Sequence, residues 1–161
     1  MGKTTSKSIY NLGDFNVTYT KDVLGFIRDV YKTNSFVKLC NISIDDVSCG
    51  KAVLSMTIDS QKHTNLYGAV HGGALESLAD TALGVVSATE GARVVTLNFS
   101  MSFIKNIKAG EKATAVATIK HHGRTTIVVD VDMFNEKGQV MCKTMATMYV
   151  IGNFDEIPRK W

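Results

Sequence analysis

The fold is decided by residues 71–91, which read HGGALESLADTALGVVSATEG. Apolar residues recur along this stretch every three or four positions, the spacing of one face of an α-helix. They are Leu75, Leu78, Ala79, Ala82, Leu83 and Val86. We therefore expect the longest helix of the chain at about residues 71–89, with this apolar face packed on a sheet.

A second stripe of the same helix holds small residues and one charge: Gly73, Ser77, Asp80, Gly84 and Ser87. Small side chains let another backbone or a slender ligand approach, and plain helix–helix packing would select them equally well. Asp80 needs a different explanation, because its sequence neighbours are apolar and an unpaired carboxylate is costly in such surroundings. A carboxylate in this setting is a candidate for catalysis. Glu76, four residues earlier, is expected to be solvated and is the rival carboxylate of this helix.

Gly72 and Gly73 open the helix, where backbone amides lack intrahelical partners and the helix dipole is positive. Such amides can stabilise the oxyanion that forms when a carbonyl is attacked, although the glycines would also suit a tight loop. Gly72 and Asp80 lie eight residues apart, or ~12 Å along a helix. Attack on a carbonyl needs contact of roughly 3 Å, so the two groups of one helix cannot serve one substrate. If both are catalytic, antiparallel helices from two chains must form the site.

The segments on either side of this helix alternate in the manner of strands. Before it we expect a helix over 21–33, a strand from Phe36 and another at Ala52–Ile58. After it come four alternating runs, at 93–104, 111–122, 125–135 and 139–151. Their short turns favour pairing in chain order. The pattern predicts an α+β fold of two layers, an antiparallel sheet with one long buried helix.

The bulk composition narrows the function. The chain has 161 residues, the length of one domain, and its apolar runs are too short to span a bilayer. A net charge of +3 is too small to indicate nucleic-acid binding and suits an anionic ligand. Cys40, Cys49 and Cys142 form no CxxC pair and indicate free thiols in a cytoplasmic protein. Residues 1–6 match the myristoylation pattern, but that pattern is short and common, so no lipid anchor is predicted.

The long helix and the loop before it carry a family resemblance. Asn65-x5-His71-Gly72-Gly73-x6-Asp80, within NLYGAVHGGALESLADTAL, is similar to the hotdog-fold thioesterases of the phenylacetyl-CoA thioesterase (PaaI-like) group. The similarity covers residues 36–151, which leaves 1–35 as an N-terminal extension with one helix and 152–161 as a tail. It implies a hotdog fold, in which an antiparallel sheet wraps one long helix and two protomers join their sheets. It also implies acyl-CoA hydrolysis by a homodimer or a homotetramer made of two dimers, with no membrane or nucleic-acid partner. No metal and no cofactor are implied, because coenzyme A is part of the substrate.

The resemblance also assigns roles to individual residues. Asp80 would be the base or nucleophile, Gly72 the oxyanion amide, and Asn65 a group that positions water or the thioester. His71 would orient the loop or the helix amides, and Thr96 occupies a position where relatives carry a hydroxyl that orients water. Contacts with coenzyme A or substrate are expected at Gly73, Val95, Leu97, Gly123 and Arg124, although Arg124 suits a solvated turn equally well.

Some alternatives remain open at this level. Asp80 can act as a general base on water or attack the thioester itself. A hotdog domain can also bind acyl-CoA as a sensor without hydrolysing it, although the retained Asp80 favours catalysis. A hydratase of the same fold is less favoured, because those enzymes are similar in their proline-containing motifs and residues 1–157 contain no proline. Aryl-acetyl and medium-chain acyl groups both fit the pattern.

Overall fold

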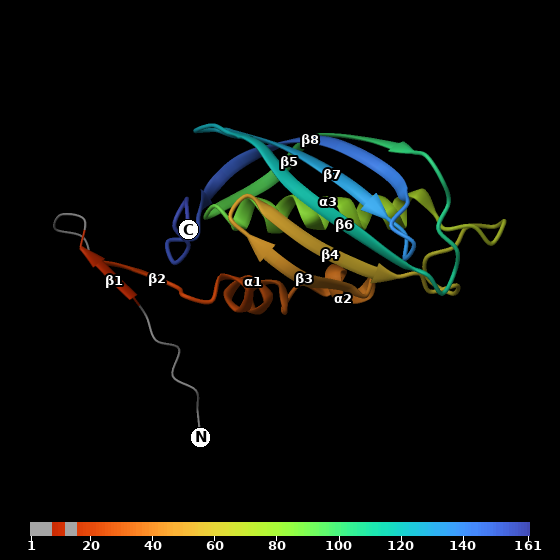
Figure 1. The fold of residues 1–161 in the computed structure, drawn as a ribbon, viewed down its shortest axis with the longest axis horizontal. Helices are drawn as coiled ribbons and strands as arrows, with labels where there is room; N and C mark the ends of the chain where they lie inside the picture. Colours follow the sequence, from red (N-terminus) through yellow and green to blue (C-terminus); the bar gives the residue numbers. More distant parts are fainter. Residues whose placement is uncertain (1–7, 12–15) are drawn as a thin grey trace, which may run out of the picture.

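The computed structural model describes residues 8–11 and 16–161, so the myristoylation pattern lies outside the described residues. An antiparallel sheet of six strands, in the order β3-β4-β6-β7-β8-β5, curls around the long helix α3 (Figure 1). The strands are β3 (Ile42–Ser48), β4 (Lys51–Thr57), β5 (Ala92–Phe103), β6 (Lys112–His122), β7 (Thr126–Phe134) and β8 (Val140–Asn153). The helices are α1 (Val23–Tyr31), α2 (Ser35–Leu39) and α3 (Gly72–Ala88). The predicted two-layer α+β architecture is confirmed.

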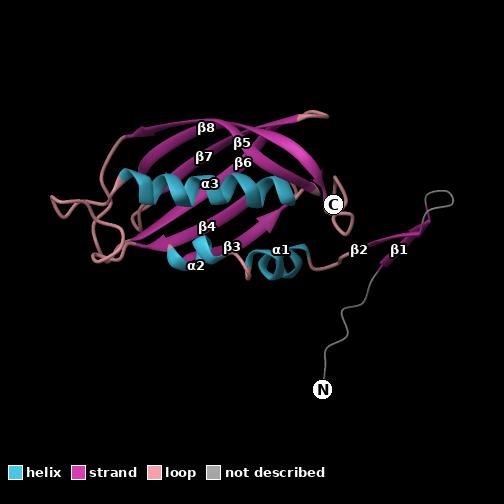
Figure 2. Cartoon of the chain, turned by 180° about the vertical axis from the view of Figure 1, so that it is seen from behind, coloured by secondary structure: helices cyan, strands magenta, loops and turns pink. Residues whose placement is uncertain are grey.

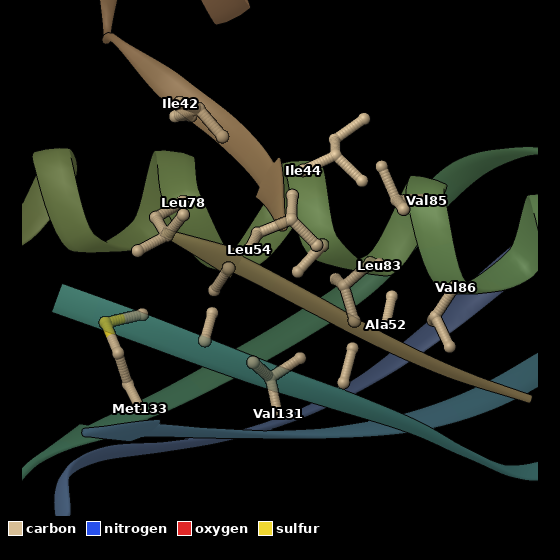
Figure 3. Packing of buried hydrophobic residues seen from close by; sticks show 14 of the residues in the cluster. Ile42, Ile44, Ala52, Leu54, Leu78, Leu83, Val85, Val86, Val131 and Met133 are labelled. Carbon is tan, nitrogen blue, oxygen red and sulfur yellow. The ribbon is translucent and has the colours of Figure 1, made fainter. Parts of the chain in front are cut away.

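Helix α3 is buried along the face that its sequence predicts. All six apolar residues of that face are buried. Between the helix and the sheet lie the side chains of Ile42, Ile44, Leu54, Val131 and Met133 (Figure 3). Along β7 every second residue is buried, because alternate side chains of a strand point to opposite faces of the sheet. The inner face of the sheet therefore forms an apolar lining for one helix.

The chain turns sharply after α3. Gly91 has a φ of +76°, a left-handed conformation that glycine adopts without strain, and a Cβ there would lie 2.6 Å from the carbonyl oxygen of Ile157. The C-terminal residues pack on this same end of the helix. Ile157 is buried, and the indole of Trp161 donates a hydrogen bond of 2.6 Å to the carbonyl oxygen of Thr89. The tail therefore covers the C-terminal end of α3.

The sheet differs from the prediction at one strand. β6, β7 and β8 pair in chain order as expected, but β5 pairs with β8 and not with β6. β6 pairs with β4, so the residues between β5 and β6 cross from one side of the sheet to the other. This connection has its own anchors, since Ile107 is fully buried and the amide of Gly110 donates to the carbonyl of Ile58 at 2.8 Å. β5 is therefore an edge strand.

The N-terminal part also corrects one expectation. Residues 35–39 form helix α2 where a strand was expected from Phe36, because Asn34 caps the segment. Its Oδ1 accepts hydrogen bonds from the amides of Phe36 and Val37 at 3.0 and 3.2 Å, and this cap outweighs the apolar alternation of a short run. Before α1, β1 (Ser8–Asn11) and β2 (Asn16–Tyr19) pair in a separate two-stranded antiparallel sheet.

Helix α1 lies beside β3 and below α3 (Figure 2). Asp22 caps it by accepting a hydrogen bond of 2.8 Å from the amide of Gly25. Arg28 donates twice to the carbonyl oxygen of Ile44 in β3, at 2.8 and 2.9 Å. These contacts fix α1 on the sheet and bring Tyr31, its last residue, against α3. No helix in the described part of the chain is long and apolar enough to cross a membrane.

Replacing Leu83 by alanine should lower the free energy of unfolding by about 2–5 kcal/mol, because removing a fully buried leucine leaves a cavity. Leu39 is a matched control, since it is 64% exposed. Its replacement by alanine should change the free energy of unfolding by less than about 0.5 kcal/mol. Urea unfolding of both variants at one protein concentration measures the difference. Equal losses would contradict the burial of α3.

Candidate active site

Asp80 of α3 and Thr96 of β5 form a hydrogen-bonded pair. The Thr96 hydroxyl donates to Asp80 Oδ1 at 2.6 Å, a length typical of a hydrogen bond to a charged oxygen. Both side chains are exposed in the single chain. This corrects the expectation of a carboxylate set among apolar side chains. Its neighbours Leu78 and Ala79 are fully buried in the core, while Asp80 belongs to the other stripe of the helix.

A β-bulge in β5 lies beside this pair. Thr96 pairs with Met148 and Asn98 with Thr147, so Leu97 is the extra residue of the bulge. Bulges often occur next to active sites because they re-aim neighbouring side chains. Here Thr96 reaches α3, whereas Leu97 is 59% exposed and Val95 48%. The two residues expected to contact coenzyme A thus flank Thr96 at the surface.

The hydroxyl groups of the small stripe are engaged within α3. Ser77 and Ser87 donate to the carbonyl oxygens of Gly73 and Leu83, four residues back, at 2.7 and 2.8 Å. A hydroxyl whose proton is held by the helix backbone is a poor nucleophile, because no base takes that proton. Asp80 is therefore the catalytic candidate of this stripe. Its rival Glu76 is exposed one turn earlier.

The start of α3 presents one unpaired backbone amide. His71 is the N-cap, and its Nδ1 accepts a hydrogen bond of 3.0 Å from the amide of Gly73. Within the described part of the chain, the amide of Gly72 has no acceptor. The Phe103 ring covers Gly72 so closely that a Cβ there would lie 3.0 Å from it. Of the two glycine amides expected to meet an oxyanion, that of Gly72 is available and that of Gly73 is engaged.

The loop before α3 is shaped by its own polar side chains. Asn65 Oδ1 accepts hydrogen bonds from two backbone amides of the loop, at 2.9 and 3.1 Å. His63 is buried, and its carbonyl accepts a hydrogen bond of 2.7 Å from the amide of His71. The oxygen of the Asn65 carboxamide therefore holds the loop. Its Nδ2 is the group that can donate to water or to a substrate.

Gly123 and Arg124 lie in the β6–β7 turn at the opposite end of α3. His122 Nδ1 lies 2.5 Å from Glu90 Oε2, which fixes this turn to the residues that follow α3. Arg124 is exposed. The 17 residues of α3, ~25 Å of helix, separate this turn from Gly72. One chain therefore does not bring Gly123 and Arg124 together with the oxyanion amide.

The catalytic candidates of one chain form two groups. His71, Gly72 and Asn65 lie at the start of α3, and Asp80 with Thr96 lies at its middle. Continuous helix separates Gly72 from Asp80 by ~12 Å. One group supplies an amide for an oxyanion, and the other a carboxylate for water or for direct attack. In one chain they lie too far apart to act on the same carbonyl.

Two aromatic residues at the site were not predicted. Phe103 covers Gly72, and the hydroxyl of Tyr31 lies over Gly84, where a Cβ would be 2.6 Å from it. Burial raises the pKa of Tyr31 to about 12, and the Asp80 carboxylate adds to the rise. Both residues come from other elements that only folding brings to α3. The only sign of these contacts in the sequence is the glycine that each aromatic residue covers.

Among residues 8–11 and 16–161, no three His, Cys, Asp or Glu side chains gather in a way that could hold a metal ion. Cys40, Cys49 and Cys142 are free thiols. Burial raises the pKa of Cys142 to about 11, which keeps this thiol protonated at neutral pH and makes it a poor nucleophile. A reaction without a metal or a cofactor stays a prediction.

A long helix wrapped by one antiparallel sheet is the hotdog fold (Figure 1). The family model described as Thioesterase superfamily matches residues 67–142. The acyl-coenzyme A thioesterase PaaI of Escherichia coli (strain K12) is 30% identical over 123 residues, which are 76% of this chain and 87% of that protein. The structure of E. coli PaaI matches with a TM-score of 0.78 at 28% identity, covering 83% of this chain and 96% of that one.

A hypothetical thioesterase of Streptococcus pneumoniae, solved with coenzyme A, is 35% identical and has a TM-score of 0.67. The match covers 70% of this chain and 90% of that one. Two variants of the pneumococcal protein are also solved, one with an aspartate and one with a threonine replaced by alanine. The chain thus belongs to the PaaI-like family of hotdog-fold acyl-CoA thioesterases, and it is a thioester hydrolase.

Replacing His71 by alanine should lower the free energy of unfolding by about 0.5–2 kcal/mol, because the amide of Gly73 loses its acceptor. Replacing His71 by asparagine should retain most of the stability, since asparagine is a good N-cap. His121→Ala is the control, because His121 is exposed. Thermal and urea unfolding measure the three variants. If His71→Ala is as stable as His121→Ala, the cap contributes nothing.

Proposed function

We propose that this protein hydrolyses acyl-CoA thioesters to a free acid and coenzyme A, with Asp80 as base or nucleophile. The observation that carries the proposal is the hydrogen bond of 2.6 Å from the Thr96 hydroxyl to Asp80 Oδ1. A donor on Oδ1 fixes the orientation of the carboxylate. Oδ2 has no hydrogen-bond partner within the described part of the chain, so it can meet water or a thioester carbonyl.

Two routes fit this geometry. In the first, Asp80 takes a proton from water while the water oxygen attacks the thioester carbonyl, and the proton then leaves with the thiolate of coenzyme A. In the second, Asp80 attacks the carbonyl, the thiolate leaves, and water hydrolyses the mixed anhydride. The negative charge on the carbonyl oxygen is the same in both. An amide at a helix start is suited to stabilise that charge.

We propose that this amide is Gly72 of a second copy of the chain. The ~12 Å of helix between Gly72 and Asp80 excludes a site within one chain. β5 supports pairing of two copies: it is an edge strand of 12 residues and carries the exposed apolar residues Val95 and Leu97. A long apolar edge strand is a template for pairing with another chain. A two-fold axis across β5 would set the two α3 helices antiparallel and complete two sites.

The relatives support the same pair of residues. The aspartate and the threonine replaced in the pneumococcal variants lie sixteen positions apart in that protein. Asp80 and Thr96 have the same separation in this chain. That thioesterase was solved with coenzyme A, which supports an acyl-CoA substrate for this protein too. Within the proposal, Asn65 positions water or the thioester, and Gly73, Val95, Leu97, Gly123 and Arg124 line the path of the substrate.

The finer parts of the proposal concern substrate and assembly. We propose an aryl-acetyl or medium-chain acyl group, the former supported by the origin of E. coli PaaI in a phenylacetic acid degradation operon. We also propose a homotetramer of two dimers. The exposed apolar residues of β8, Met145, Tyr149 and Ile151, provide a surface for the second contact. Free cysteines support a cytoplasmic location.

Asp80→Asn should lower kcat by at least ~100-fold, because the base or nucleophile is lost. Thr96→Val should lower it by about tenfold, the effect of losing one hydrogen bond to a charged group. Glu76→Gln is the matched control on the same helix and should stay within a few-fold of the wild type. Release of free coenzyme A from phenylacetyl-CoA and octanoyl-CoA measures all three. Near-normal activity of a folded Asp80→Asn variant would refute the assignment.

The shared site can be tested by mixing two inactive variants. Gly72→Pro removes the amide hydrogen, and proline is tolerated at the first residue of a helix. The backbone of His71 is extended, with φ −73° and ψ 132°, which also suits a residue before proline. Gly72→Ala is the control, because it adds a Cβ near Phe103 but keeps the amide.

Gly72→Pro and Asp80→Asn homodimers should each be nearly inactive. In a mixed dimer one site collects both defects and the other collects neither, so co-refolding should restore up to half of the wild-type sites in each mixed dimer. Size-exclusion chromatography with light scattering checks that mixed dimers form. Correctly assembled mixed dimers without activity would show that each chain forms its own site.

A further inference from the structure

Tyr31 places a hydroxyl group on the small stripe of α3. It is the last residue of α1, and a Cβ added to Gly84 would lie 2.6 Å from its hydroxyl oxygen and 3.8 Å from its Cζ. The first distance is too short for a contact between a Cβ and an oxygen, whereas the second is ordinary van der Waals contact. Gly84 therefore lacks a side chain at the point where the Tyr31 hydroxyl lies.

Tyr31 lines two hollows of the surface. The first, of about 370 Å³, is lined by Tyr31 together with Gly84 of α3, Val94 of β5, Val30 and Phe154, and by polar side chains that include Asn34 and Arg93. The second, of about 660 Å³, is lined by Tyr31 together with Val37, Ile42 and Ile44, and by the charged side chains of Arg28, Asp29, Lys32 and Lys38. Both volumes are in the range of sites for small ligands. Each hollow therefore combines an apolar part, which suits an acyl group, with polar and charged side chains.

Tyr31 also lies close to the reaction centre. Gly84 follows Asp80 by four residues on the same stripe, or ~6 Å along the helix. The Asp80 carboxylate contributes, after burial, to the raised pKa of Tyr31. Within the described part of the chain the Tyr31 hydroxyl has no hydrogen-bond partner. The Tyr31 side chain lies one helical turn from the Asp80 carboxylate. It is therefore placed to contact the far end of an acyl group whose carbonyl lies at Asp80.

We propose that Tyr31 sets the length of the acyl group that this enzyme accepts, by closing the path that runs from Asp80 past Gly84. The inference rests on the proposed function, in which the thioester carbonyl lies at Asp80. The distance from Asp80 to Gly84 matches about four carbon–carbon bonds, or one aryl ring, at ~1.5 Å a bond, so the inference favours the aryl-acetyl group over medium-chain groups. Without the Tyr31 ring, the two hollows would join and longer chains would enter.

The first test is a chain-length profile. Tyr31→Ala should raise the ratio of kcat/KM for long straight-chain acyl-CoAs to kcat/KM for butanoyl-CoA by about tenfold or more. The reason is that the additional methylene groups of the longer chains could then be buried in a pocket. Tyr31→Phe keeps the ring and should keep the wild-type limit. Tyr19→Ala is the matched control, since Tyr19 lies on β2 in the separate two-stranded sheet. An unchanged profile in Tyr31→Ala would overturn the proposal.

The second test uses the contact with Gly84. Gly84→Ala should displace the Tyr31 side chain and change the chain-length profile, because its Cβ would meet the hydroxyl at 2.6 Å. Combining Gly84→Ala with Tyr31→Phe removes that hydroxyl and should restore the wild-type profile. An effect of Gly84→Ala that persists in the double variant would assign it to the helix rather than to Tyr31, and would count against the proposal.

A binding measurement separates this inference from the proposed function. The Asp80→Asn variant should bind acyl-CoAs without consuming them, so calorimetry can compare affinity with chain length in Asp80→Asn and in Asp80→Asn with Tyr31→Ala. If the wild type hydrolyses no acyl-CoA, the proposed function fails, and the affinities still test Tyr31. If hydrolysis occurs but neither rates nor affinities for long chains respond to Tyr31→Ala, this inference alone fails.

Discussion

The structure depends on the burial of one face of α3 inside a curved sheet. Eight of the ten buried residues of the helix belong to the hydrophobic cluster, which also takes residues from the strands, from α1 and α2, and from connecting segments (Figure 3). Apolar burial of this extent is the main stabilising term in a domain of this size. It fixes the rotation of α3 about its own axis. Because that rotation is fixed, Asp80 lies outside the apolar face and meets Thr96 of the edge strand β5.

The positions of the candidate catalytic groups follow from the two sides of α3, the apolar face in the core and the stripe that carries Asp80. On the stripe that carries Asp80, the serine hydroxyls bond to the helix backbone, and Asp80 is held by Thr96 from the edge strand β5. The start of the same helix offers the amide of Gly72. A rigid helix keeps this amide and the carboxylate apart at a constant distance. Two copies of a rigid element can place them together more reproducibly than one flexible loop.

Much of this arrangement was predictable because it is local in the sequence. The period of α3, the alternation of β6 to β8 and the spacing from Asn65 to Asp80 are properties of short segments. The edge position of β5 was not predictable, because it depends on how residues 104–111 anchor through the buried Ile107. Helix α2 was missed because the cap at Asn34 outweighs a short apolar pattern. Tyr31 and Phe103 were missed because they contact α3 from segments distant in the sequence. The glycines that they cover, Gly84 and Gly72, do not reveal which residue covers them.

The cap at His71 has a consequence for inhibitor design. Since His71 occupies the amide of Gly73, an attacked carbonyl in the proposed site would meet a single backbone donor from this helix. Mimics of a tetrahedral intermediate draw much of their affinity from the donors that surround their oxyanion. With one such donor, a compound of this kind would gain less here than in a site with two. Selectivity of such an inhibitor would have to come from its acyl part and its coenzyme A part, and the tetrahedral group between them would contribute little.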